Sequence, residues 1–238
     1  MTLYSLPQKL AAEFLGTFAV VFVAAGTLCA QQYLREAGQP VIGSLEYALA
    51  YGLITAAMMA ALGHVSGGHL NPAITLGLWV TRRTGTINAL FYCIAQTLGG
   101  IAAAYALVAV LPDAGWAASG LRMITPGLIA DFSRWNAMVL ECGITAIVVF
   151  VYFGFGIGTQ EKFPPLAGFA VGAALSVATL FAGPFTGAAL NPARVLGPAL
   201  ATHHWQSHGV YWVGPLSGGV IAGVLYEQLF LRHHRNRS

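Results

Sequence analysis

Long apolar segments separated by short polar or turn-forming stretches run through the whole chain. Six of these segments are about 20 residues long, which is the length that an α-helix needs to cross a hydrocarbon core of roughly 30 Å. They cover approximately residues 8–30, 42–63, 87–110, 135–157, 165–182 and 209–231. The pattern predicts an all-α membrane protein with six transmembrane helices, and residues 1–238 are expected to form a single transmembrane domain.

Two further apolar segments, residues 66–80 and 186–200, are too short to cross a bilayer. Each begins with small residues and then has Asn followed by Pro, at Asn71–Pro72 and Asn191–Pro192. Asn is a favoured N-cap and Pro is favoured at the first helical position. We therefore expect two re-entrant half-helices, since irregular backbone at membrane depth is tolerated only inside protein or beside a water-filled cavity.

The two short segments form part of an internal repeat. At an offset of 120 residues, the segment SGGHLNPAITLG, which begins at Ser66, matches TGAALNPARVLG, which begins at Thr186. Further upstream, Glu13 with Thr17 in the first span corresponds to Glu141 with Thr145 in the fourth. Repeat 1 covers about residues 8–110, repeat 2 covers about 135–231, and an outer loop at about 111–134 joins them. Because each repeat holds three spans, the second lies inverted relative to the first, and the two half-helices meet near the midplane, where such folds place their functional site.

Composition supports a membrane location. Charged residues make up 8% of the chain and apolar residues 57%, and the net charge of +3 is scattered without an aromatic-interleaved basic patch, so nucleic acid is not an expected partner. Basic residues in short connections are retained in the cytoplasm. Their distribution predicts cytoplasmic termini, with Lys9, Arg82, Arg83, Lys162, Arg232, Arg235 and Arg237 inside, and Arg35, Arg122 and Arg134 outside.

The paired Asn-Pro-Ala motifs (NPA), which end at Ala73 and Ala193, are followed in the second case by Arg194 and preceded in the first by GHVSGGH. Together with the paired glutamates they closely resemble the aquaporin, or major intrinsic protein, family, over nearly the whole chain. The resemblance implies an aquaporin-like fold and a passive channel that conducts water and excludes protons and ions. It also implies a homotetramer in the plasma membrane or bacterial inner membrane, with no cofactor.

The chemistry of the two asparagines can be argued from their positions. As N-caps, Asn71 and Asn191 direct their carbonyl oxygens to backbone N–H groups of their own helices and leave their NH₂ groups to donate into the lumen. A water molecule that accepts both points its hydrogens away along the pore, which interrupts proton hopping. The converging positive helix ends oppose cations.

The resemblance places the selectivity constriction at Tyr51, Thr179, Ala188 and Arg194. An in-membrane charge such as Arg194 is by default functional, although snorkelling to the outer interface is the alternative. Water-selective members commonly have Phe and His at the first two positions, so Tyr51 and Thr179 predict a wider filter. Val195, where glycerol-conducting members have Asp, and the Tyr211–Trp212 pair favour water instead.

Structural support is the role that the resemblance implies for Glu13 and Glu141, which would hold the loops that carry the motifs. The backbone carbonyls of those loops, at Gly67, Gly68, His69, Gly187 and Ala189, would then line the pore as acceptors. His64 and His69 flank the first motif, and we interpret them as braced against the loop rather than as a gate. Proton coupling by the glutamates is the alternative interpretation.

The same sequence features allow functions other than a water channel. The nearest is a broader channel for glycerol, urea, ammonia, hydrogen peroxide or metalloid acids. Less favoured are an ion-coupled secondary transporter and a non-conducting membrane scaffold. No catalytic constellation is present, so an enzyme is not expected. No metal site is expected either, because His203, His204 and His208 have no carboxylate or cysteine near them in sequence.

Overall fold

The computed structural model describes residues 4–111, 125–156 and 164–231. All regular secondary structure in the described residues is helical, which confirms the predicted fold class. Its six long helices are α1 (Leu6–Glu36), α2 (Ser44–Ser66), α4 (Thr86–Val110), α6 (Arg134–Gly156), α7 (Pro165–Thr186) and α9 (Val210–Tyr226). The two short ones are α3 (Pro72–Val80) and α8 (Pro192–Thr202), and a π-helical turn, η1 (Glu227–Leu231), continues α9.

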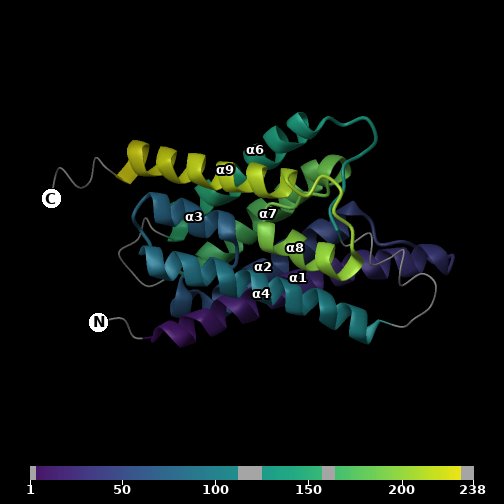
Figure 1. Ribbon diagram of the computed structural model, residues 1–238, viewed down its shortest axis with the longest axis horizontal. Helices are drawn as coiled ribbons and strands as arrows, with labels where there is room; N and C mark the ends of the chain where they lie inside the picture. Colours follow the sequence, from purple (N-terminus) through teal and green to yellow (C-terminus); the bar gives the residue numbers. More distant parts are fainter. Residues whose placement is uncertain (1–3, 112–124, 157–163, 232–238) are drawn as a thin grey trace.

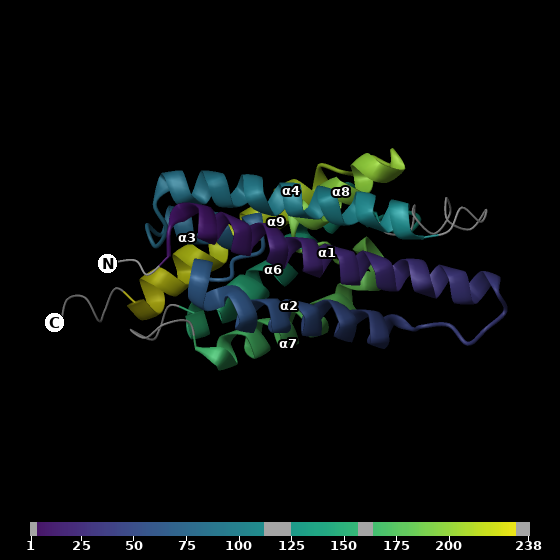
Figure 2. The same cartoon turned by 90° about the horizontal axis from the view of Figure 1, so that it is seen from below.

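The long helices run roughly parallel to one axis of the molecule (Figure 1). Within the bundle α1 packs on α4 and α2, α2 packs on α7, and α6 packs on α9 and α7. The half-helices fill the interior, with α3 beside α9 and α8 beside α4. The start of α1, the α3–α4 connection and the end of η1 lie at one end of the bundle (Figures 1 and 2). This arrangement is the one that an inverted repeat of three spans and a half-helix requires.

Five of the long helices are long and apolar enough by themselves to cross a membrane. The sixth, α9, has 17 residues and reaches a similar length only together with η1. The predicted spans therefore correspond to α1, α2, α4, α6, α7 and the combined α9–η1 segment.

Helix α1 continues further than the sequence pattern predicted. The predicted first span ends near residue 30, whereas the helix extends to Glu36. Polar side chains one turn apart stabilise this extension, because Gln32 donates to Glu36 (2.7 Å) and accepts from Arg35 (3.0 Å). A hydrophobicity pattern reports where the bilayer ends, and it misses helix that continues into water.

Two glycines, one on each of two long helices, set how closely the half-helices approach. A methyl group added at Gly219 of α9 would collide with the carbonyl oxygen of Ala73 in α3, and one at Gly100 of α4 would collide with the carbonyl oxygen of Ala193 in α8. Small residues allow helix backbones to pack closely in lipid, where no hydrophobic driving force holds helices together. The two contacts are related by the internal repeat, so each half-helix is held by equivalent packing.

Candidate functional site

Asn71 and Asn191 occupy the N-caps of α3 and α8, as expected. The Oδ1 atom of Asn71 accepts from the backbone N–H of Ala73 (2.8 Å), and that of Asn191 accepts from Ala193 (3.0 Å). Pro72 and Pro192 are the first helical residues. Each cap thus satisfies one of the backbone donors that a helix leaves unpaired at its N-terminus.

The amide nitrogens of the two asparagines also join the repeats. Asn71 donates to the carbonyl of Leu190 (2.9 Å), and Asn191 donates to the carbonyl of Leu70 (2.9 Å). This differs from the expectation that both N–H bonds of each amide face the lumen. One N–H of each NH₂ group is used across the repeat, and the other remains to donate into the pore.

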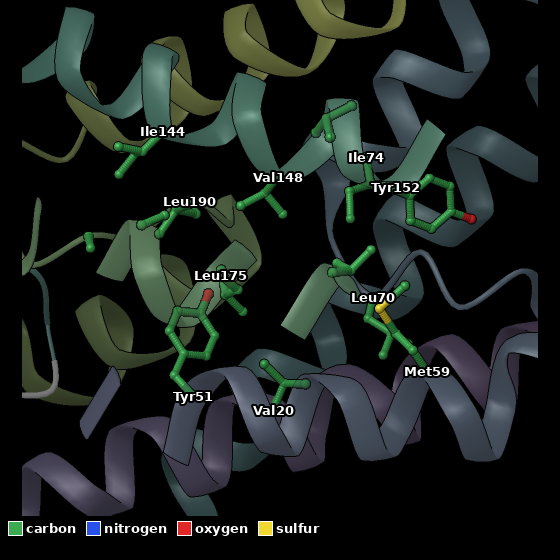
Figure 3. Packing of buried hydrophobic residues seen from close by; sticks show 14 of the residues in the cluster. Val20, Tyr51, Met59, Leu70, Ile74, Ile144, Val148, Tyr152, Leu175 and Leu190 are labelled. Atoms are coloured by element: carbon green, nitrogen blue, oxygen red, sulfur yellow. The ribbon is translucent and has the colours of Figure 1, made fainter. Parts of the chain in front are cut away.

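Both asparagines line a narrow cavity at the centre of the molecule, with about 20 Å³ of space for water-sized molecules. A cavity needs roughly 10–15 Å³ by such a measure to hold one water. Most of its wall is apolar. Figure 3 shows side chains from five different helices converging around this space, namely Val20 (α1), Tyr51 (α2), Ile74 (α3), Val148 (α6) and Leu175 (α7). Water in this cavity therefore finds donors at the two amides, with the polar side chains of Thr55 and His69 in the same wall.

Glu13 is buried against the first loop and accepts four hydrogen bonds. The donors are Ser66 Oγ (2.5 Å), the backbone N–H groups of His69 (3.0 Å) and Leu70 (2.7 Å), and Gln96 Nε2 (2.7 Å). These bonds satisfy backbone groups that the non-helical loop between α2 and α3 cannot pair by itself.

Glu141 holds the second loop in the equivalent way. It is also buried, and it accepts from Thr186 Oγ1 (2.6 Å) and from the backbone N–H groups of Ala189 and Leu190 (both 3.0 Å). Every one of these groups donates to the carboxylate. The geometry therefore suits a supporting acceptor in both repeats.

Unusual backbone conformations mark both loops at matching positions. Gly67 and Gly187 have φ angles of 96° and 76°, and Leu70 and Leu190 have φ angles of 51° and 54°. Ala188 (φ 46°) stands where the first repeat has Gly68 (φ 61°). A left-handed conformation costs a residue with a Cβ roughly 1–2 kcal/mol, so the fold holds Ala188 against its own preference.

Several loop carbonyls that were expected to line the pore accept from tyrosines. Tyr152 donates to the carbonyl of Gly67 (2.7 Å), and Tyr51 donates to that of Ala189 (3.1 Å). A carbonyl oxygen has a second lone pair, so both can still accept from a molecule in the pore. His69 is buried, lines the central cavity and lies 3.1 Å from Thr75 Oγ1 through its Nδ1 atom.

The residues expected at the constriction lie together near the first turn of α8. Arg194 is 1% exposed, and its guanidinium carbon lies 5.0 Å from the centre of the Tyr51 ring. Thr179 is buried and lines the same cavity as Arg194, and Ala188 is buried in the hydrophobic cluster that includes Tyr51. Snorkelling of Arg194 to the interface is contradicted by this burial. The Nε and Nη1 atoms of Arg194 and the Oγ1 atom of Thr179 have no hydrogen-bond partner among the described residues.

Tyr47 belongs to this cluster, although the sequence reasoning did not identify it. Its hydroxyl accepts a hydrogen bond from Arg194 Nη2, and its ring stacks on Tyr51 with centroids 6.4 Å apart. The signal was present in the sequence, because Tyr47 precedes Tyr51 by one helical turn and so shares its face of α2.

A wider cavity with about 250 Å³ of space, here called the vestibule, lies on one side of the layer formed by Tyr51 and Arg194. Tyr47, Thr179 and Arg194 line it, together with Thr125, whose hydroxyl lies 3.1 Å from that of Thr202. The vestibule and the central cavity share no lining residue. The buried layer around Tyr51 and Arg194 therefore lies between two separate spaces.

The remaining histidines do not form a metal site within the described residues. No group of three or more metal-ligating side chains occurs within residues 4–111, 125–156 and 164–231. His208 accepts from Trp212 Nε1 (3.0 Å), and partial burial lowers the pKa of its imidazole. His64 is exposed, and its ring lies 5.8 Å from that of Tyr4 in an edge-on contact. A supporting role for His64 stays a prediction.

Comparison with known proteins gives consistent results over nearly the whole chain. Residues 2–226 match the family model described as Major intrinsic protein. The chain is 37% identical over 234 residues to aquaporin Z from Photorhabdus laumondii, covering 94% of this chain and 97% of that protein. It is 39% identical over 222 residues to the lens fiber major intrinsic protein of Gallus gallus, covering 92% and 80%.

A solved structure has the same fold. The X-ray structure of the aquaglyceroporin from Plasmodium falciparum superimposes with a TM-score of 0.84, covering 98% of this chain and 100% of that one, at 21% sequence identity. At this identity the likeness shows the fold alone.

Proposed function

The chain belongs to the major intrinsic protein family, whose members are membrane channels, and from this premise we propose that it conducts water passively while it excludes protons and ions. The observation that carries the proposal is the pair of asparagine amides that line one narrow cavity where two half-helices meet. Water is small enough for that cavity and can accept from both amides.

Proton exclusion follows from the donors at the cavity. A water oxygen that accepts from Asn71 and Asn191 has both of its hydrogens turned outward, so the hydrogen-bonded chain changes direction there and a proton cannot hop through. The N-termini of α3 and α8 add positive potential at the same point. The apolar remainder of the wall offers a cation no replacement for its hydration shell.

Selection of the solute is assigned to the layer of Tyr51, Thr179, Ala188 and Arg194. The unpartnered donors of Arg194 and the hydroxyl of Thr179 give a passing molecule hydrogen bonds in place of those it leaves in water. The buried guanidinium also repels cations. In this layer a neutral molecule is accepted by size and hydrogen bonding, and an ion is refused.

A second candidate is a broader channel for small neutral solutes. The observation that favours it is the small side chain of Thr179, which borders a vestibule of about 250 Å³ with its hydroxyl unpartnered. Glycerol and urea carry both donors and acceptors and could use the same groups. The two candidates differ in one quantity, the ratio of solute to water permeability.

The test is stopped-flow light scattering of proteoliposomes under osmotic gradients of sucrose, glycerol and urea, with protein-free liposomes as the baseline. A water channel predicts fast shrinkage in sucrose and no fast re-swelling in glycerol or urea. Solute flux comparable with water flux would establish the broader channel instead.

Two other outcomes would contradict both candidates. Saturable uptake that depends on an imposed pH or sodium gradient would indicate a secondary transporter. Shrinkage no faster than that of protein-free liposomes would indicate a non-conducting scaffold. We propose no catalytic activity for this chain.

We also infer the setting of the channel. The whole chain, residues 1–238, forms one transmembrane unit in the cell membrane with both termini in the cytoplasm, and four copies assemble with one pore in each. Support for the orientation comes from Lys9 in the first turns of α1 and from Arg82 and Arg83 in the α3–α4 connection, since these segments lie at one end of the bundle together with η1 (Figure 1), whose Glu227 pairs with Arg83. The other basic residues in the cytoplasmic set, Lys162, Arg232, Arg235 and Arg237, and Arg122 of the outer set lie outside the described residues.

A further inference from the structure

One side chain among the described residues accepts a hydrogen bond from Arg194, and it belongs to none of the family motifs. The Nη2 atom of Arg194 donates to the hydroxyl of Tyr47, one turn of α2 further toward the vestibule than Tyr51. We propose that Tyr47 is a positioning residue of the constriction, which fixes the Arg194 guanidinium against the wall of the pore so that the lumen stays open. The inference rests on the proposed channel function and concerns the same site.

The geometry favours a clamp made of both tyrosines. The guanidinium carbon lies 5.8 Å from the ring centre of Tyr47 and 5.0 Å from that of Tyr51. The two rings are nearly parallel, with an interplanar angle of 27°. A cation within about 6 Å of an aromatic ring is attracted to its face. The rings therefore form one surface beside the guanidinium, and the Tyr47 hydroxyl sets its direction.

The hydrogen bond to Tyr47 is important because the other nitrogens of the guanidinium have no partner among the described residues. Its Nε and Nη1 atoms are buried and have no partner within the described part of the chain. Arginine has a long side chain with several rotatable bonds, and it loses much conformational freedom when it is ordered. Without the Tyr47 hydroxyl, the guanidinium would keep its contacts with the two tyrosine rings. It would have no hydrogen-bond partner among the described residues. It would then be free to swing across the lumen that it borders.

A purely structural role for Tyr47 predicts something different. Tyr47 is 7% exposed and belongs to the main hydrophobic cluster, so its ring also contributes to packing. Packing depends on the ring and hardly on the hydroxyl. Replacement by Phe therefore separates the two roles, because it keeps the ring and removes only the atom that accepts from Arg194.

The experiment measures unit water permeability in proteoliposomes for the wild type, Tyr47→Phe, Arg194→Val and the double variant, each normalised to the amount of channel. Loss of a hydrogen bond to a charged group shifts the ratio of held to released guanidinium by about tenfold or more. If the wild-type guanidinium is held about ten times as often as it is released, this shift leaves about half of it held, and we expect the permeability of Tyr47→Phe to fall to about half. Tyr105→Phe, on the exposed face of α4, is the matched control and should behave as the wild type.

The double variant makes the test specific to Arg194. If Tyr47 acts through the guanidinium, Tyr47→Phe should change nothing in the Arg194→Val background, because no guanidinium remains to be released. An unchanged permeability for Tyr47→Phe would overturn the proposal. An equal loss in the Arg194→Val background would overturn it as well, since the hydroxyl would then act by another route.

Failure of the proposed function is distinguishable from failure of this inference. If the wild type does not conduct, the channel assignment is wrong and the comparison of variants has no meaning. If the wild type conducts and the variants give either of the two contrary results, only the role of Tyr47 is refuted. Thermal unfolding of Tyr47→Phe in detergent should match the wild type, which excludes loss of fold as the cause of a lower permeability.

Discussion

Thr179 is the residue at which the two candidate functions separate. It lines the vestibule next to Arg194, and its hydroxyl is buried with no partner among the described residues. A threonine fills less space than the imidazole that the resemblance leads one to expect. The side chain therefore adds both width and a hydrogen-bonding group at the narrow layer.

Thr179→His should narrow the constriction. An imidazole placed opposite Arg194 reduces the free cross-section, and an increase of about 1.4 kcal/mol in the barrier to solute lowers its flux about tenfold. Water, being smaller, should keep most of its flux. Stopped-flow measurement of the glycerol-to-water ratio checks this result. Thr179→Ser is the control and should not narrow the pore, whereas an equal ratio for the wild type and Thr179→His would mean that Thr179 does not border the path.

Glu13→Gln should destabilise the protein. A glutamine can accept at one position only, so its NH₂ group would face donors that now reach the second carboxylate oxygen, the backbone N–H of Leu70 and the amide of Gln96. Each buried donor left unpaired costs roughly 1–3 kcal/mol. Thermal unfolding in detergent should show a lower midpoint. Asp131→Asn, at an exposed position in a turn, should leave the midpoint unchanged, and equal effects of the two substitutions would contradict the supporting role of Glu13.

At the scale of elements, α3 and α8 depend on contacts that each repeat supplies twice. Each half-helix has an Asn cap, a buried glutamate holding the loop before it, and a glycine on the helix beside it. Short helices are marginal by themselves, and most helical stability in proteins comes from packing. The position of each half-helix is thus set by its neighbours.

Gly219→Ala should displace α3. The added methyl would meet the carbonyl oxygen of Ala73, which belongs to backbone and cannot move aside as a flexible side chain can. Overpacking of this kind costs typically 1–3 kcal/mol. We expect a lower unfolding midpoint together with reduced water permeability.

Gly143→Ala is the matched control for that substitution. Gly143 also lies within a long helix, α6, but a methyl group there would have no heavy atom within 4 Å. Alanine favours a helix over glycine by roughly 0.5–1 kcal/mol. This variant should be as stable as the wild type or more stable, and a loss like that of Gly219→Ala would argue against close packing as the cause.

The sequence predicted the repeat, the half-helices and their caps because these follow from local rules. Asn followed by Pro before an apolar run favours a helix start, and an odd number of spans inverts the second repeat whatever the packing. Tyr47 was missed because its role depends on where Arg194 points, which is a matter of three-dimensional contact. The cross-repeat bonds of Asn71 and Asn191 were missed for the same reason.

At the scale of the whole molecule, the outer surface is strongly apolar. Large hydrophobic side chains are exposed on every long helix, including Leu53 on α2 and Val177 on α7. Such a surface suits lipid and contacts between copies of the chain. Native mass spectrometry should find a tetramer, and a channel that is monomeric in a mild detergent and in lipid would contradict that part of the proposal.

The orientation can be tested with a matched pair of cysteine variants. Gly85→Cys lies in the α3–α4 connection and Gly209→Cys lies just before α9, and a side chain at either position would meet nothing within 4 Å. With cytoplasmic termini, an impermeant maleimide added to intact cells should label Gly209→Cys and spare Gly85→Cys. The reverse pattern would mean that the channel is inserted the other way round.

The reciprocal bonds between the repeats also bear on how the protein is made. Asn71 leaves the ribosome long before Leu190, the residue whose carbonyl accepts from its amide, because 119 positions separate the two. A nascent chain that has inserted only its first three spans therefore contains half of a conduit and no continuous path. The central cavity, which both asparagines line, is therefore complete only once the second repeat has been inserted.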